Sequence, residues 1–413
     1  MGAGERDAGS GERQGLVGDV GQRAARGVGA SPRTLIVSDL HLGGVSHSDL
    51  LRRAELRAPL LDAITDVQRV VLLGDVLELR HGPMREALAA ARPFFEDLGR
   101  ALASRSAEGT GELVIVAGNH DHALVEPWLA GRGEEREPAP LEVEQLLDPE
   151  QASPALGRIA GWVAPAQMRV AYPGLWLRSD VYATHGHYLD CHLTVPTIER
   201  LSVGAMSRLL GVPASEFHGV DDYESTVAPL FAWRDAVARD AHTGAALNGA
   251  ATVSAWHALS GGDARSGQGL RASLSRLRGR AVAAAFPLAV AALNRAGIGP
   301  LRADISMNEL RRAGLTAMGE VAARLDLGDA YVVFGHTHRA GPLAGDEPGE
   351  WRGRGGARLV NAGSWTYSRI FLGHAGRDSP YWPGTCVLVE DDRPPRLVHL
   401  LGGRTHAQIA TPR

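Results

Sequence analysis

The stretch Thr34-Leu-Ile-Val-Ser-Asp-Leu-His-Leu42 joins a short apolar segment to two polar side chains. Thr34–Val37 has the composition of a buried strand, and Asp39 and His41 follow it two residues apart. Side chains at positions i and i+2 of an extended segment point to the same side of the chain. A carboxylate and an imidazole therefore leave the strand end together, an arrangement that a divalent metal ion can use. Such a pair also fits an ordinary turn, so the metal hypothesis depends on matching ligands elsewhere in the chain.

The sequence after this stretch alternates between predicted helices and strands. Residues 50–67 and 84–104 carry apolar residues at helical spacing, whereas residues 69–73 and 112–117 are short runs rich in β-branched residues. This alternation is typical of an α/β domain. Further strands are predicted at residues 168–172, 176–184, 330–334, 358–360, 385–389 and 396–400, with a loop at 131–140 and a helical stretch at 198–325.

The composition excludes several classes of protein. With 413 residues, of which 44% are hydrophobic, the chain can bury a sizeable core and is not a disordered chain. The formal net charge of −4 argues against a protein with a strong basic field for nucleic acids. The two cysteines, Cys191 and Cys386, form neither a disulfide framework nor a CxxC metal motif, so we expect free thiols in a reducing compartment.

The sequence contains no segment that we expect to enter a membrane. Residues 1–31 are rich in Gly, Arg and acidic residues and are predicted to be a disordered tail, neither a signal peptide nor an anchor. The longest apolar run, residues 281–293, has 13 residues and contains Pro287, so it is too short to span a bilayer as a helix. We therefore expect a cytoplasmic protein, and the sequence does not indicate its oligomeric state.

Five predicted strands end in residues that can bind a metal ion. These residues are Asp39 and His41, Asp75, Asn119 and His120, His185, and His336 and His338. Ligand sites in α/β sheets lie outside the carboxyl ends of the strands, so we expect the five ends to meet. Three of the ends contain a glycine before the ligand (Gly74, Gly118 and Gly335), which is predicted to let the backbone turn sharply toward the site.

The donor atoms of this set indicate the metal and the chemistry. Asp and Asn oxygens with several imidazoles suit Mn²⁺, Fe or Zn²⁺ better than an all-oxygen Mg²⁺ or Ca²⁺ site. The donors are too many for one ion and about enough for two. Two divalent ions outweigh the charges of Asp39 and Asp75, so the centre should attract phosphate. Metal binding also lowers the pKa of water from 15.7 to about 7, which supplies hydroxide at neutral pH.

The chain resembles the calcineurin-like metallophosphoesterases in five motifs that occur in the same order. They are Asp39-x-His41, Gly74-Asp75, Gly118-Asn119-His120-Asp121, His185 and Gly335-His336-x-His338. The resemblance spans roughly residues 34–400, apart from the helical stretch, and implies a four-layer α/β/β/α sandwich with a dinuclear metal centre. It implies that Asp39, His41 and His338 hold the first ion, that Asn119, His185 and His336 hold the second, and that Asp75 bridges both.

The resemblance also implies in-line attack on phosphorus by a hydroxide that bridges the two ions, with Mn²⁺ favoured and Fe, Zn²⁺ or Ni²⁺ as alternatives. His120 is the predicted general acid, because an imidazole titrates near neutral pH. Asp121 either orients His120 or caps the next turn. The predicted function is hydrolysis of a phosphoester or pyrophosphate bond in a phosphorylated small molecule or a lipid-linked substrate.

We expect one domain from residue 32 to residue 413, with a helical insertion at about residues 192–325. The insertion falls between two ligand-bearing segments and should form a cap that selects the substrate. Its apolar run at 281–293 would form a buried helix of the cap, which is the favoured interpretation, or face a lipid-like substrate or a membrane surface. The UDP-2,3-diacylglucosamine hydrolases have a helical insertion too, but they carry Arg where this chain has His120.

Other polar residues near the motifs have two interpretations each. His187, Asp190 and His192 follow His185 and would either support the metal ligands or hydrogen-bond locally. Arg339 would contact the substrate phosphate or be solvated. The turn at residues 361–364, Asn-Ala-Gly-Ser, would give structural support near the site.

Two other functions compete with a phosphohydrolase. A chain of this fold that has lost catalysis would serve as a scaffold or binding module, and it need not retain metal ions. A nuclease is the second alternative. The acidic net charge and the lack of a basic run speak against it, so no stable nucleic-acid partner is expected.

Overall fold

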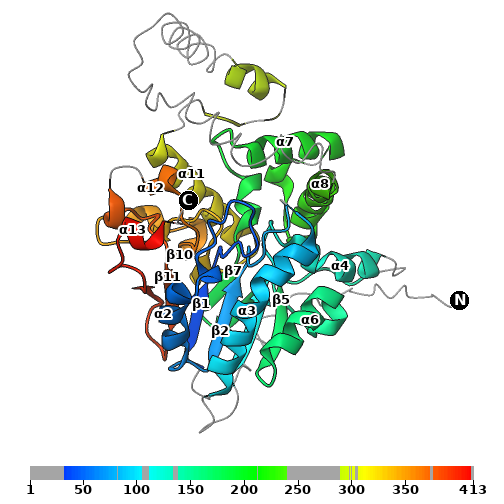
Figure 1. The fold of residues 1–413 in the computed structure, drawn as a ribbon. Helices are drawn as coiled ribbons and strands as arrows, with labels where there is room; N and C mark the ends of the chain where they lie inside the picture. Colours follow the sequence, from blue (N-terminus) through cyan, green and yellow to red (C-terminus); the bar gives the residue numbers. More distant parts are fainter. Residues whose placement is uncertain are drawn as a thin grey trace, which may run out of the picture.

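The computed structural model describes residues 32–410, except residues 81, 105–110, 134–137, 212, 240–288, 297, 299, 303–305 and 373–374. Within these residues the chain is an α/β protein with two mixed β-sheets and flanking helices (Figure 1), which confirms the predicted α/β class. None of the described helices is both long and apolar enough to cross a membrane. The predicted tail at residues 1–31 and most of the apolar run at 281–293 lie outside the described residues.

The larger sheet contains seven strands in the order β12-β11-β1-β2-β3-β5-β4. The central strands β1, β2, β3 and β5 run parallel, and β11, β12 and β4 extend the sheet in antiparallel fashion. The bounds are Thr34–Val37 (β1), Arg69–Leu73 (β2), Glu112–Val116 (β3), Gln145–Leu147 (β4), Gln167–Tyr172 (β5), Thr385–Val389 (β11) and Arg396–His399 (β12). Because Leu35 lies opposite Val70 and Val70 opposite Leu113, the carboxyl ends of β1, β2 and β3 reach the same edge.

The smaller sheet contains five strands in the order β6-β7-β8-β10-β9, of which β7, β8 and β10 are parallel. The bounds are Gly174–Arg178 (β6), Val181–Thr184 (β7), Tyr331–Phe334 (β8), Ala340–Gly341 (β9) and Arg358–Ala362 (β10). The prediction of one strand at residues 176–184 is wrong, because the chain turns at Ser179 and Asp180 and forms the antiparallel pair β6 and β7. Strands β5 and β6, which follow one another across Pro173, belong to different sheets.

Helices flank the two sheets. Their bounds are Ala54–Ile64 (α2), Met84–Ala103 (α3), Glu126–Gly133 (α4), Pro149–Ala152 (α5), Pro154–Val163 (α6), Ile198–Leu210 (α7), Val220–Arg239 (α8), Met307–Arg324 (α11), Arg369–Leu372 (α12) and His406–Ile409 (α13), with the 3-10 helix η3 at His187–Cys191. Helix α3 matches its prediction closely. Helix α4 reaches into the loop predicted at 131–140.

Three clusters of buried apolar side chains hold the layers together. One cluster takes side chains from both sheets, including Ile36, Val71 and Val333. A second joins the larger sheet to α2, α3 and α6, and a third joins the smaller sheet to α11 and η3. Leu35 and Val70 point to the second cluster, whereas their neighbours Ile36 and Val71 point to the first. This alternation is expected of strands that are buried on both faces.

The described chain between β7 and β8 is helical, in agreement with the prediction for residues 198–325. In Figure 1, α7 and α8 lie at the top of the view, above the strands, whereas α2, α3 and α6 lie alongside them. Helix α11 contacts η3 and β10 and contributes to the cluster of the smaller sheet. It therefore covers this sheet as well as belonging to the predicted insertion.

Candidate metal centre

The predicted metal ligands all lie at one edge, formed by the carboxyl ends of strands from both sheets. Asp39 and His41 follow β1, Asp75 follows β2, Asn119 follows β3, His185 follows β7, and His336 and His338 follow β8. Backbone hydrogen bonds tie these loops together. The amide of Asp39 donates to the carbonyl of Gly74 (3.2 Å), and the amide of Gly335 donates to the carbonyl of His185 (3.0 Å). Each sheet thus holds its ligand-bearing loops in fixed register.

Five of the ligand positions have a backbone conformation that is uncommon outside glycine. Asp39, His41, Asp75, His336 and His338 have φ between +47° and +65°. This left-handed conformation costs an L-residue about 1–2 kcal/mol. Such strain persists only where the surroundings hold the residue in place, and it clusters at functional sites. Five strained ligands at one edge therefore indicate a functional site rather than ordinary turns.

The glycines next to these ligands have two different roles. Gly74 has φ +79°, as predicted for a sharp turn. Gly118 and Gly335 do not have a positive φ. These two glycines allow close approach instead, because a Cβ on Gly118 would overlap the Asp75 carboxylate and a Cβ on Gly335 would overlap the Ser38 hydroxyl. A side chain at either position would push the ligand-bearing loops apart.

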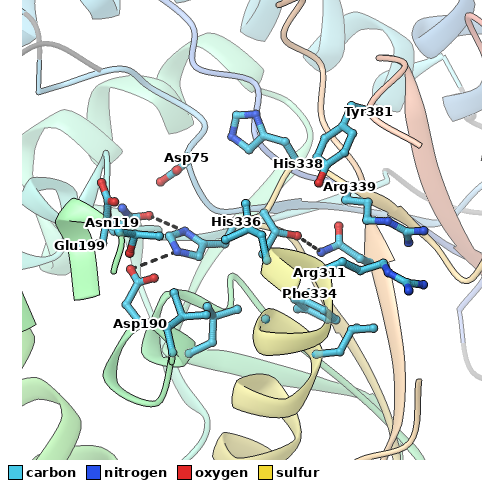
Figure 2. A pocket seen from close by; sticks show the side chains of 18 of the residues that line it. Asp75, Asn119, Asp190, Glu199, Arg311, Phe334, His336, His338, Arg339 and Tyr381 are labelled. Atoms are coloured by element: carbon cyan, nitrogen blue, oxygen red, sulfur yellow. Dashed lines mark hydrogen bonds and ion pairs between the residues drawn. The ribbon is translucent and has the colours of Figure 1, made fainter. Parts of the chain in front are cut away.

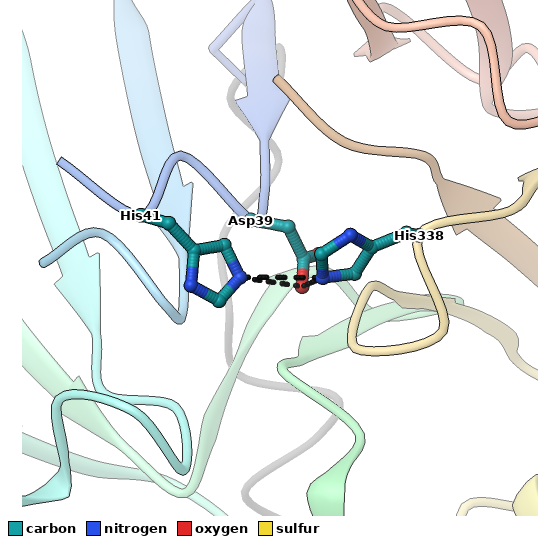
Figure 3. Close-up of side chains that lie close together, drawn as sticks. All are labelled: Asp39, His41 and His338. Carbon is teal, nitrogen blue, oxygen red and sulfur yellow. Dashed lines mark hydrogen bonds and ion pairs between the residues drawn. The ribbon is translucent and has the colours of Figure 1, made fainter. Parts of the chain in front are cut away.

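Asp39, His41 and His338 form the first group of converging ligands (Figure 3). Nε2 of His338 lies 3.2 Å from Oδ1 of Asp39 and 3.2 Å from Nε2 of His41. On the far side of each ring, Nδ1 of His41 faces the Glu78 carboxylate (3.1 Å) and Nδ1 of His338 faces the Thr366 hydroxyl (3.3 Å). When each Nδ1 donates its proton to this neighbour, both Nε2 atoms present a lone pair to the same point.

Asp75, His185 and His336 form the second group. Asn119 reaches the same point, and Figure 2 shows its contact with His336. Nε2 of His185 lies 3.3 Å from Oδ2 of Asp75, and Oδ1 of Asn119 lies 3.1 Å from a ring nitrogen of both His185 and His336. The other ring nitrogens face acceptors, namely the Leu73 carbonyl for His185 (3.0 Å) and the Asp190 carboxylate for His336 (3.1 Å). These acceptors select the tautomers that leave lone pairs for a metal ion.

The Asp75 carboxylate lies between the two groups. Its Oδ2 is 3.6 Å from Nε2 of His41 and 3.3 Å from Nε2 of His185. Burial by itself raises the pKa of this carboxyl, but the neighbouring imidazoles, that of His185 first, hold the pKa well below its usual range. Asp75 is therefore an anion at neutral pH, in a position to bridge two cations.

The donor set fits two adjacent divalent ions. Each group brings a carboxylate oxygen and two imidazole nitrogens to within 4.8 Å of one another. In addition, Oδ1 of Asp39 is buried and has no hydrogen-bond donor aligned with it among the described residues. A buried carboxylate oxygen without a donor is costly unless a cation neutralises it. Mixed oxygen and imidazole ligands suit Mn²⁺, Fe or Zn²⁺.

Protons take the place of cations in the metal-free molecule. Burial lowers the pKa of His41, but the hydrogen bond to Glu78 and the charge of Asp75 outweigh it and raise the pKa to about 9. Burial likewise opposes protonation of His185, and the charge and hydrogen bond of Asp75 raise its pKa to about 9. Without a bound metal ion, both imidazoles are therefore protonated on both nitrogens and positively charged at neutral pH. Metal binding must then release these protons.

The Asn119 carboxamide can be assigned with either its oxygen or its nitrogen toward the rings of His185 and His336. With the nitrogen toward His185 and His336, it donates to both rings (3.1 Å each), and its oxygen accepts from the Arg80 guanidinium (2.9 and 3.0 Å). With the oxygen toward the rings, it can ligate a metal ion. Metal binding by Asn119 therefore requires the second orientation.

His120 lies beside Asp75 and is held by Glu78, a residue that was not predicted from the sequence. Nδ1 of His120 lies 2.8 Å from Oε2 of Glu78, and its Nε2 lies 4.0 Å from Oδ2 of Asp75. The same Glu78 carboxylate faces Nδ1 of His41, so one buried side chain positions a metal ligand and the predicted acid. Burial and then the charge of Arg80 lower the pKa of His120 to about 3. The only sequence signal for Glu78 is a carboxylate three residues after Asp75.

Asp121 caps the turns after β2 and β3 and does not orient His120. Its Oδ2 accepts from the amides of Val76 (2.7 Å) and Leu77 (3.2 Å), and its Oδ1 accepts from the amide of Gly118 (2.7 Å). Burial, together with the charge of Asp75, raises its pKa to about 6. These contacts agree with the capping alternative, and the catalytic assignment of Asp121 stays a prediction.

The residues that follow His185 differ in their roles. Asp190 supports the site directly through its contact with His336. His187 is buried, and its ring nitrogens have no hydrogen-bond partner among the described residues. His192 lies 2.7 Å from the Tyr223 hydroxyl and is a local hydrogen-bonding group.

Two later residues flank the His336 loop. Arg339 is largely buried and forms an ion pair with Asp346, so it is not a solvated side chain. Asn361 donates to the carbonyl of Gly335 (2.9 Å), which agrees with the predicted supporting role of this turn.

No family model matches this chain, and no curated protein matches it. Its function therefore has to be inferred from the residues of the site and from their geometry.

Proposed function

We propose that this protein is a phosphohydrolase that uses two divalent metal ions, with Mn²⁺ favoured and Fe, Zn²⁺ or Ni²⁺ as alternatives. The observation that carries the proposal is the shared Asp75 carboxylate, which is grouped with His41 on one side and with His185 and His336 on the other. Two divalent ions outweigh the two aspartate charges at this centre, and the remaining positive charge suits an anionic phosphate ester.

A four-layer α/β/β/α sandwich is part of the proposal. It is supported by the apolar cluster that takes side chains from both sheets and by the helices that pack on the other side of each. Together with the order of the ligands along the chain, this arrangement supports kinship with the calcineurin-like metallophosphoesterases.

When bound, the metal ions would polarise the phosphoryl oxygens and lower the pKa of a water to about 7. Asp39, His41 and His338 would hold one ion, Asn119, His185 and His336 the other, and Asp75 both. Glu78 and Asp190 hold the imidazoles of His41 and His336 in the tautomers that ligation needs.

His120 is the proposed general acid, and its lowered pKa sets a condition on that role. The imidazole is neutral in the substrate-free molecule, so it must gain a proton at Nε2 when the substrate binds. The negative phosphate opposes the charge of Arg80, and Glu78 accepts from Nδ1, so both stabilise the protonated ring. His120 then gives the Nε2 proton to the leaving oxygen.

The test is turnover of an aryl phosphate and of a phosphodiester by the purified protein with Mn²⁺. Activity should disappear on chelation and in Asp75→Ala. Asp62→Ala, an exposed carboxylate on α2, is the matched control and should retain activity. Unchanged turnover in Asp75→Ala would sink the proposal. Retention of two ions without turnover of either substrate would favour the scaffold alternative, and salt-dependent binding and cleavage of DNA would favour the nuclease.

A cytoplasmic location also belongs to the proposal. It is supported by Cys191 and Cys386, both of which are buried free thiols.

A further inference from the structure

A pocket opens from the candidate metal centre toward α11 and the turn around Trp351. Its volume is about 260 Å³, and its inner end is formed by metal-centre side chains that include Asp75, His120 and His338. A cavity of about 150 Å³ accommodates benzene. The pocket therefore has room for a phosphoryl group and a compact organic group of about one ring.

The pocket wall beyond the metal centre is largely apolar. The apolar lining residues include Leu189, Leu193, Leu310 and Leu315 of α11, Trp351 and Phe371. Leu189, Leu193, Leu315 and Trp351 are buried, whereas the Phe371 side chain is 39% exposed and stacks on Tyr381, with ring centroids 5.8 Å apart. A substrate group that binds in this pocket leaves water and contacts apolar side chains instead.

Both arginines of the wall are ion-paired, and Glu350, the partner of Arg311, also pairs with Arg312 (2.9 Å). The Arg339 guanidinium pairs with Asp346 (Nη1 to Oδ2, 3.1 Å), and the Arg311 guanidinium pairs with Glu350 (2.7 Å) and faces Asp346 (3.5 Å). The side chains of Arg311, Arg339 and Asp346 are at most 16% exposed. In Figure 2 both arginines point away from Asn119 and Asp190. Each arginine among the described lining residues therefore already has an acidic partner.

The remaining charged side chains of the wall are acidic. Asp190 contacts His336, and Glu199 of α7 lines the same pocket. Among the described lining residues, a carboxylate or phosphate on the leaving group would therefore lose its hydration without meeting an arginine that lacks an acidic partner, and burial of such an unpaired charge is strongly unfavourable. By contrast, burial of apolar surface contributes a favourable free energy of roughly 25 cal/mol for each Å² removed from water.

We infer that the substrate is a phosphate ester whose leaving group is compact, uncharged and apolar, such as a phenol or a branched alcohol, rather than a nucleotide or a pyrophosphate. This inference rests on the proposed phosphohydrolase function. The reaction adds one water: the water oxygen bonds to phosphorus, the bond from phosphorus to the leaving oxygen breaks, and the leaving oxygen takes a proton to become the alcohol.

A matched pair of substrates tests the charge argument. The Mn²⁺-loaded protein should have a kcat/KM for phenyl phosphate at least about tenfold above that for 4-carboxyphenyl phosphate and for inorganic pyrophosphate. Equal or reversed preference with measurable turnover overturns this inference and leaves the phosphohydrolase proposal standing. Loss of turnover with every phosphate compound overturns both.

Variants of Phe371 test the apolar wall. Phe371→Ala should lower the ratio of kcat/KM for phenyl phosphate to that for methyl phosphate by about 3–10-fold, and Phe371→Leu by less. Phe371→Arg should shift the preference toward 4-carboxyphenyl phosphate. Leu146→Ala, at an exposed leucine on β4 outside the pocket, is the control and should keep the wild-type ratio. An unchanged ratio in both Phe371→Ala and Phe371→Arg overturns the assignment.

Discussion

The Nε2 atoms of His41 and His338 lie 3.2 Å apart, although the two histidines are 297 positions apart in the chain. Two imidazole nitrogens at this distance must share a proton or a cation, because facing lone pairs repel each other. Oδ1 of Asp39 lies 3.2 Å from Nε2 of His338, and its negative charge stabilises a proton or a metal ion at this position. The contact between His41 and His338 therefore marks the position of the first proposed ion.

Replacement of His41 should empty this position and leave the other one filled. His41→Ala is expected to reduce the Mn²⁺ content from about two ions per chain to about one, because Asp75, Asn119, His185 and His336 are unchanged. Elemental analysis after gel filtration measures the content. His399→Ala, on the edge strand β12, is the control and should retain both ions. An unchanged metal content in His41→Ala would contradict the assignment.

Glu78 should act through the two imidazoles that it contacts. Glu78→Gln keeps the shape of the side chain but removes the charge that orients His41 and His120. The expected loss is about 10–100-fold in metal affinity or activity. The pH profile of kcat should also change, whereas the midpoint of urea unfolding should stay nearly the same. A loss of stability in place of the altered profile would show that Glu78 only supports the fold.

Asp121 should matter for stability. Asp121→Ala removes three hydrogen bonds to backbone amides, from Val76, Leu77 and Gly118, and leaves buried donors without an acceptor. The expected cost is on the order of 2–4 kcal/mol in the free energy of unfolding, measured by urea denaturation at pH 7. An unchanged stability together with a lower kcat would instead favour the catalytic assignment of Asp121.

His192 should make the protein less stable in mild acid. Burial, and then the charge of Arg324, lower the pKa of His192 to about 4, against 6.5 for an ordinary histidine. Between these two values the unfolded chain binds a proton that the folded chain does not, so stability is present above pH 6.5 and is lost as the pH falls toward 4.

The measurement is the free energy of unfolding at pH 7 and pH 5. Wild type should lose about 1–2 kcal/mol more than His192→Gln over this interval. The difference between the two proteins isolates His192 from the other histidines. Equal losses in the two proteins would mean that His192 is protonated in the folded state.

The strands and the ligands at their ends could be predicted because their signals are local. The apolar run from Leu35 to Val37 predicts a strand in any context, and the polar residues that end five such runs identify the candidate ligands. The α/β class follows from the same alternation of strands and helices. The split of residues 176–184 into β6 and β7 was missed, because the turn at Asp180 interrupts a run that is otherwise uniformly strand-like.

The sequence by itself therefore determined which side chains follow the strand ends. The spacing of apolar residues that marks a strand can be read from residues close together in the chain. The tertiary structure alone decided what each polar group contacts. Asp121 caps turns and Glu78 holds two imidazoles because the loops after β1, β2 and β3 are packed together. The pairing of Arg311 with Glu350 likewise depends on the packing of α11 against the turn at Pro348–Trp351. Hydrogen bonds and ion pairs act over a few ångströms, so only the folded chain decides which residues come within that distance.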